Sequence, residues 1–181
     1  MLTKVEKEKK ISYAASFGKD YGENFSKVNY LSFIEKFINA IKDISHISLR
    51  ENVKVIPDLE CECIALDPVL LYSCFNDWNK HSVRSKNVVP KQYDFYFFYD
   101  YEPNKINVSI KENDKYIFFI SKKTNLEEVP GIEEWIWLIK NCKTLYTNSY
   151  HAYIFATIFN VPVRYNADNF RIQQLQVFCK I

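Results

Sequence analysis

Short apolar runs alternate with stretches of helical spacing along most of this chain, and that alternation restricts the fold more than any other feature. Strands are expected at 10–16, 46–49, 63–66, 93–99, 116–120, 144–147 and 161–164. Helices are expected at 29–43, 132–141, 150–159 and 169–178. The run at 93–99 is aromatic and continuous, which suits a strand covered on both faces. This order predicts an α/β fold with a Rossmann-like parallel sheet and helices on both faces.

Length and charge restrict the class of protein. A chain of 181 residues suits one domain, so a single α/β domain over 1–181 is predicted. Hydrophobic residues make up 48% and charged residues 25%, which is ordinary for a globular protein and unlike a disordered chain. The net charge of +2 creates no field that would select nucleic acid, so no nucleic-acid partner is expected.

The apolar runs and the cysteines bear on the compartment. No run reaches the roughly 18 apolar residues of a membrane helix, and the charged start lacks the apolar stretch of a signal peptide. The five cysteines are odd in number and form no CxxC pair, which indicates reduced thiols and a cytoplasmic protein. Cys61, Cys63, Cys74 and His81 are residue types that bind zinc, but their spacing matches no structural zinc pattern. Neither a metal nor a cofactor is expected.

Ligands of parallel sheets bind beyond the carboxyl ends of the strands. That rule selects four turns, at 16–18, Arg50, Asp67 and 148–151. In the last, Asn148 or Ser149 can cap the helix that follows, and the amides of a helix start favour an anion. His151 in the first turn could then donate a proton or contact a phosphate. The alternative is a capped helix with a histidine packed beside the sheet.

The other three turns have structural alternatives as well. Arg50 offers a planar fork for a carboxylate or phosphate, or it could pair on the surface with Glu51 or another acid. Asp67-Pro68 could simply be a turn before a helix. Gly18 allows a tight turn or a close backbone approach.

Five segments resemble motifs of the polysaccharide pyruvyl transferase family, in the same order over residues 11–171. They are Ile11-Ser12-Tyr13-Ala14-Ala15-Ser16-Phe17-Gly18, Ile47-Ser48-Leu49-Arg50-Glu51, Leu66-Asp67-Pro68-Val69-Leu70-Leu71, Glu134-Trp135, and Thr147-Asn148-Ser149-Tyr150-His151-Ala152 with Phe155 and Phe159-Asn160-Val161-Pro162. The chain is therefore similar to the C-terminal portion of such a transferase, over about 11–175. Arg171 stands where the family often has an arginine, whereas Ala152 replaces the usual glycine after the histidine.

The resemblance implies transfer of pyruvate from phosphoenolpyruvate to two hydroxyls of a sugar or polysaccharide, in the biosynthesis of a cell-surface polysaccharide. It implies catalytic roles for His151 and Arg50. It implies substrate contacts at Asn148, Ser149, Ser16, Gly18, Asp67 and Arg171. It also implies the C-terminal lobe of a two-lobed, GT-B-like transferase, with the N-terminal lobe absent. Self-association, or a partner that supplies that lobe, is then expected.

Two other functions stay open at this point. A glycosyltransferase would bind a nucleotide sugar at the same helix start. A truncated binding or assembly subunit would catalyse nothing.

Overall fold

The computed structural model describes residues 5–15, 41–50, 63–99, 115–120 and 123–165, and the single positions 32, 35, 36, 38, 39, 172, 173 and 175. The chain divides into two compact units, the first made of Met1–Leu71 and Gln173–Ile181 and the second of Tyr72–Ile172. A single domain over 1–181 stays a prediction, and each unit is described by itself.

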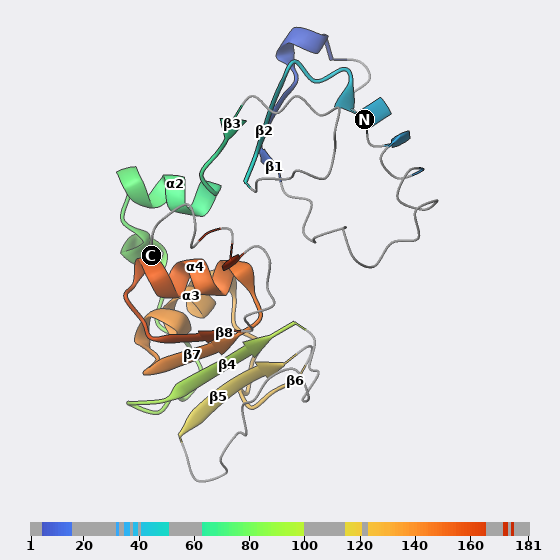
Figure 1. The fold of residues 1–181 in the computed structure, drawn as a ribbon. Helices are drawn as coiled ribbons and strands as arrows, with labels where there is room; N and C mark the ends of the chain where they lie inside the picture. Colours follow the sequence, from blue (N-terminus) through green and yellow to red (C-terminus); the bar gives the residue numbers. More distant parts are fainter. Residues whose placement is uncertain are drawn as a thin grey trace. The chain divides into compact units, whose positions relative to one another are not determined.

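In its described residues the first unit contains a parallel sheet with the strand order β1-β2-β3 (Figure 1). The strands are β1 (Ile11–Ala15), β2 (His46–Leu49) and β3 (Cys63–Ile64), and a short 3-10 helix, η1 (Lys7–Lys9), precedes them. Leu49 and Ala14 are the most buried apolar residues of this sheet. Because all three strands run in the same direction, the residues that follow them gather at one edge.

A bulge interrupts the pairing of β1 with β2. Ser12 pairs with Ile47 and Ala15 with Leu49, so two residues of β1 lie opposite Ser48. Ala14 has a φ of 50°, in the left-handed region that residues with a side chain seldom adopt. The Ser48 hydroxyl accepts a hydrogen bond from the Ala14 N–H at 3.0 Å and donates to the Ser12 carbonyl at 3.3 Å. This hydroxyl satisfies backbone groups that the bulge separates.

Helix α2 (Pro68–Phe75) follows β3 after a short extended stretch. Pro68 suits the first helical position, where its missing N–H has no helical partner to lose. Asp67 precedes it and accepts a hydrogen bond from the Val69 N–H at 2.9 Å, which caps the helix. The 3-10 helix η2 (Trp78–His81) comes next and is capped in the same manner by Asp77.

The second unit contains a sheet with the strand order β6-β5-β4-β7-β8 in its described residues. The strands are β4 (Asp94–Phe98), β5 (Tyr116–Ile120), β6 (Lys123–Thr124), β7 (Thr144–Thr147) and β8 (Val163–Tyr165). All neighbours pair in parallel except β5 with β6. The chain goes from β4 to β5 on one side and continues through β7 and β8 on the other. The strand order therefore reverses at the junction of β4 and β7.

Two helices cover this sheet, α3 (Ile132–Asn141) and α4 (Tyr150–Ile158). They contact each other and lie on the same side of the sheet (Figure 1). The described residues thus show helices on one face, and the predicted helices on the second face stay a prediction. No helix in the described part of the chain is long and apolar enough to cross a membrane.

The core of the second unit is built around β4. Phe95, Tyr96, Phe97 and Phe98 are all at most 8% exposed, which confirms that both faces of this strand are covered. Tyr96 also stacks on Tyr146 of β7, with ring centroids 4.5 Å apart. Burial of each aromatic ring contributes about 1.5–3 kcal/mol, which makes β4 the main stabilising strand of the unit.

Asn125 completes the outer edge of β5. Strand β6 pairs only with Phe119 and Ile120. Beyond it, the Asn125 carboxamide accepts from the Phe118 N–H at 2.9 Å and donates to the Tyr116 carbonyl at 3.0 Å. One side-chain amide therefore takes the place that a neighbouring strand would occupy.

Most elements agree with the expected ones. The strands at 46–49, 116–120 and 144–147 and the helix at 132–141 have the predicted bounds. The described positions within 29–41 and 169–178 are helical, namely 32, 35, 36, 38, 39, 41, 172, 173 and 175, whereas 42 and 43 form a turn. Strand β6 and the 3-10 helices η1 and η2 were not among the expected elements, and helix α2 is the helix that a turn at Asp67-Pro68 would precede.

Candidate functional site

Arg50 lies at the carboxyl edge of the first sheet. It follows β2 directly, and its backbone N–H donates to the carbonyl of Ala15 at the end of β1, at 3.0 Å. On the other side of β2, the Ala65 N–H donates to the Leu49 carbonyl at 2.7 Å. The base of the Arg50 side chain is therefore fixed by pairing on both flanks, and 16% of that side chain is exposed.

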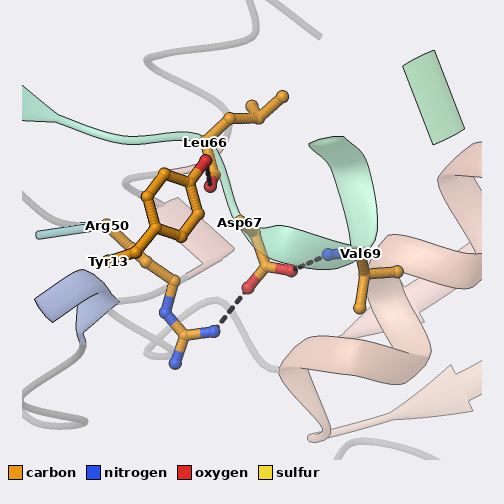
Figure 2. Close-up of polar contacts among 5 residues, drawn as sticks. All are labelled: Tyr13, Arg50, Leu66, Asp67 and Val69. Carbon is orange, nitrogen blue, oxygen red and sulfur yellow. Dashed lines mark hydrogen bonds and ion pairs between the residues drawn. The ribbon is translucent and has the colours of Figure 1, made fainter. Parts of the chain in front are cut away.

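Asp67 meets Arg50 at this edge (Figure 2). Its carboxylate is 1% exposed, with Oδ2 paired to Nη1 of Arg50 and Oδ1 bound to the Val69 N–H. The Asp67 carbonyl also accepts from the Leu71 N–H at 2.8 Å. Loss of one partner from a buried ion pair costs about 3–5 kcal/mol, because the other charge is left uncompensated. For Arg50, the structural alternative was an ion pair with an acidic residue. The structure shows this ion pair, and the acidic residue is Asp67.

A hydrogen bond from the Tyr13 hydroxyl connects β1 to the segment that follows β3. It donates to the Leu66 carbonyl at 3.0 Å, which joins β1 to the residue just before Asp67 (Figure 2). Tyr13 belongs to the bulged part of β1, so the bulge and the Arg50–Asp67 pair lie at the same end of the sheet.

The turn from Thr147 to His151 lies in the second unit, where β4 and β7 end side by side. The Thr147 hydroxyl donates to the Phe97 carbonyl at 2.7 Å and accepts from the Ser149 N–H at 2.9 Å. The Asn148 carboxamide oxygen accepts from the Tyr99 N–H at 3.1 Å. Since the strand order reverses at this junction, the turn occupies the switch point at which open parallel sheets bind ligands.

Ser149 is the cap of helix α4. Its hydroxyl accepts from the Ala152 N–H at 3.3 Å, and the residue is only 1% exposed. The sequence left Asn148 and Ser149 as alternatives, and the structure selects Ser149 as the cap. The hydroxyl is thereby engaged within the protein, while the helix start retains the partial positive charge that favours an anion.

His151 is the second residue of α4 and is partly exposed. Its ring packs edge-on against the Tyr150 ring, with centroids 5.3 Å apart and planes at 72°. Tyr150 is 7% exposed, so the buried tyrosine supports one side of the histidine. A partly exposed imidazole in the first turn of a helix can donate or accept a proton at the strand ends.

The model of the polysaccharide pyruvyl transferase family matches residues 2–165. The chain belongs to this family. The match includes Arg50, Asp67 and the 147–151 turn, which occupy the carboxyl ends of strands in the two sheets. Searches of curated proteins and of solved structures found no significant match to this chain.

The Glu134-Trp135 motif makes structural contacts in this member of the family. Glu134 accepts from the backbone N–H groups of Lys86 and Gly131, at 2.8 and 3.0 Å, and so caps α3. These hydrogen bonds lower the pKa of the Glu134 carboxyl, and the one from the Lys86 N–H has the larger effect. Trp135 packs between Phe97 and Phe155, with centroids 5.3 and 5.5 Å away, and joins β4 to α4. The motif thus supports the strand and the helix that form the switch point.

Three predicted substrate contacts, Ser16, Gly18 and Arg171, lie outside the described residues. The predicted contacts at Asn148 and Ser149 adjoin His151, and Asp67 adjoins Arg50. In the parts of the chain that are described, no group of three or more His, Cys, Asp or Glu side chains is arranged to bind a metal.

Sequence reasoning missed two supporting residues, Ser48 and Tyr99. Tyr99 could have been noticed, because it ends a predicted strand at the ligand edge. Ser48 gave no such signal. A serine inside an apolar strand can lie on either face of the sheet, and it does not predict a bulge in the neighbouring strand.

Proposed function

We propose that this chain transfers the pyruvyl group of phosphoenolpyruvate to two hydroxyls of a sugar, forming a cyclic ketal in the biosynthesis of a cell-surface polysaccharide. The observation that carries the proposal is the family match over residues 2–165. The geometry supports it, because a guanidinium and a partly exposed histidine each follow a strand at the carboxyl edge of a parallel sheet.

Arg50 binds the carboxylate or the phosphate of the donor in this proposal. A guanidinium presents five N–H donors in a planar fork, which suits both anions. The fixed backbone at the end of β2 and the low exposure of the side chain favour a preorganised cation over a mobile surface charge.

The 148–151 turn binds the phosphate and supplies the proton. In this proposal Asn148 and Ser149 hold the phosphate oxygens together with the backbone amides at the start of α4. His151 donates a proton to C3 of the donor, which becomes a methyl group as C2 becomes electron-poor. In the alternative role, His151 keeps its proton and its imidazolium stabilises the phosphate as it departs.

The atoms balance without a metal or a redox cofactor. One sugar hydroxyl adds to C2, and the second displaces phosphate from C2. Of the two protons that the hydroxyls release, one replaces the proton given to C3 and the other leaves with the phosphate.

We further propose that the reaction takes place in the cytoplasm. In the described part of the chain, Cys142 is a buried free thiol. Free thiols are typical of a reducing compartment.

Calorimetric titration of the chain with phosphoenolpyruvate tests the proposal. Saturable binding is expected, and Arg50→Ala should weaken it by about ten- to hundredfold, because a hydrogen-bonded charge pair contributes about 1.5–3 kcal/mol. His151→Ala should lower phosphate release in the presence of methyl glycosides by at least about a hundredfold. Matched controls are Arg84→Ala and His46→Ala, because both side chains are exposed and His46 begins β2, at the opposite end of that strand from Arg50.

The same titration separates the alternatives. Binding of a nucleotide sugar in place of phosphoenolpyruvate would replace the proposal with glycosyl transfer. A folded chain that binds neither compound would be a binding or assembly subunit.

A further inference from the structure

Asp67 is poorly suited to direct contact with an anionic donor. Its carboxylate is 1% exposed, and both oxygens already have partners, Nη1 of Arg50 and the Val69 N–H. A carboxylate also repels a phosphate or another carboxylate. Burial, saturation with partners and charge all argue against substrate binding by this residue.

We propose that Asp67 is a positioning residue, which orients the Arg50 guanidinium toward the donor anion. This inference rests on the proposed function, in which Arg50 binds phosphoenolpyruvate. The ion pair engages Nη1 and so restrains the position and the orientation of the guanidinium. Asp67 acts through Arg50 and does not touch the substrate.

The position of the Asp67 carboxylate is set by α2. The Val69 and Leu71 N–H groups bind its side chain and its carbonyl, at 2.9 and 2.8 Å. The Tyr13 hydroxyl fixes the preceding carbonyl, that of Leu66. Figure 2 shows Arg50 and Val69 on opposite sides of the carboxylate. The start of a helix therefore determines where a strand-end arginine points.

A serine at position 67 separates the two tasks of the aspartate. Serine caps helices well, so α2 keeps its cap. The serine hydroxyl carries no charge and its side chain is shorter, so it cannot replace the ion pair with Arg50. Asp67→Ser should weaken phosphoenolpyruvate binding by on the order of tenfold, because a mispositioned contact loses most of its effect. The KM for phosphoenolpyruvate should rise by a similar factor, with a smaller change in kcat.

Asp77→Ser is the matched control. Asp77 also caps a helix, through the Asn79 N–H at 2.8 Å, but it is exposed and η2 follows it. Donor binding by this variant should equal that of the wild type. Should Asp67→Ser not fold, Asp67→Asn makes the same comparison, because its carboxamide keeps an acceptor for Val69.

A double-mutant cycle decides the matter. If Asp67 acts through Arg50, Asp67→Ser should add nothing to the loss of binding in Arg50→Ala. Independent losses, or unchanged binding in Asp67→Ser alone with Arg50→Ala impaired, would overturn the positioning role and leave the proposed function intact. If the wild-type chain binds no phosphoenolpyruvate, the proposed function and this inference both fail.

Discussion

At the scale of single residues, Ser48 shows how a small side chain can maintain an irregular strand. Its hydroxyl lies in the bulge of β1, between the Ala14 N–H and the Ser12 carbonyl, and the residue is 9% exposed. The bulge lies at the end of the sheet that carries Arg50. Ser48, which has no proposed role in substrate binding or catalysis, therefore maintains the edge of the sheet at which Arg50 lies.

Replacement of Ser48 by alanine should destabilise the chain by about 1–3 kcal/mol, because a buried backbone donor and acceptor lose their partner. Urea unfolding followed by circular dichroism measures the loss. Ser82→Ala is the control, since the Ser82 hydroxyl oxygen is buried without a hydrogen-bond partner in the described part of the chain. An equal loss in both variants would show that the bulge does not depend on the hydroxyl.

The Arg50–Asp67 pair also shows what a sequence can reveal about single residues. Both were predicted at strand ends, because apolar runs end at Leu49 and Leu66. Their pairing was not predicted, since it requires β3 to lie beside β2 and α2 to begin at Pro68. Neighbour relations between strands depend on tertiary packing, which a local pattern does not contain.

At the scale of elements, the predictions were best where periodicity and boundary signals agreed. Helix α3 begins after Pro130-Gly131 and shows helical spacing, and both of its bounds were predicted. A helix after Asp67-Pro68 was one interpretation, but the bounds of α2 were not predicted, because the apolar residues from Val69 to Leu71 are consecutive and do not show one helical face. Strand β6 has two residues, too few for any alternation to be read.

The cap of α3 makes a prediction about acid stability. Glu134 has a pKa lowered from 4.5 by the Lys86 and Gly131 N–H groups, so the folded state binds its proton less tightly than the unfolded state does. The stabilisation is therefore present above pH 4.5 and is lost as the pH falls through the lowered pKa.

Glu134→Gln should accordingly be less stable than the wild type near neutral pH, with a modest difference because the carboxyl is near the surface. The difference should shrink in urea unfolding at a pH of about 3. Glu133→Gln, an exposed neighbour in the same turn, is the control. A difference that grows on acidification would contradict the assigned hydrogen bonds.

At the scale of the whole molecule, the family match runs through both compact units. Each unit contains one strand-end cluster, the Arg50–Asp67 pair in the first and the 147–151 turn in the second. The α/β class could be predicted from the alternation of elements alone. The division into two units could not, because the contacts that define them join residues far apart in the sequence.

Phosphoenolpyruvate should stabilise the whole chain. A ligand at a hundred times its Kd adds about 2.7 kcal/mol, which corresponds to an increase in Tm of about 5–10 °C for a chain of this size. Differential scanning fluorimetry measures the shift. Arg50→Ala should abolish most of it, whereas Arg84→Ala should keep it. An equal shift with inorganic phosphate alone would mean that the pyruvyl part is not recognised.

The carboxamide of Asn125 has a further consequence for this chain at high concentration. Strand β5, with the sequence Tyr-Ile-Phe-Phe-Ile, has a composition that favours cross-β aggregation when its backbone edge is open. Asn125 occupies the backbone groups of Tyr116 and Phe118, and β6 occupies those beyond them. An incoming strand therefore finds no continuous row of donors and acceptors, so a single amide side chain protects the native fold from edge-to-edge aggregation.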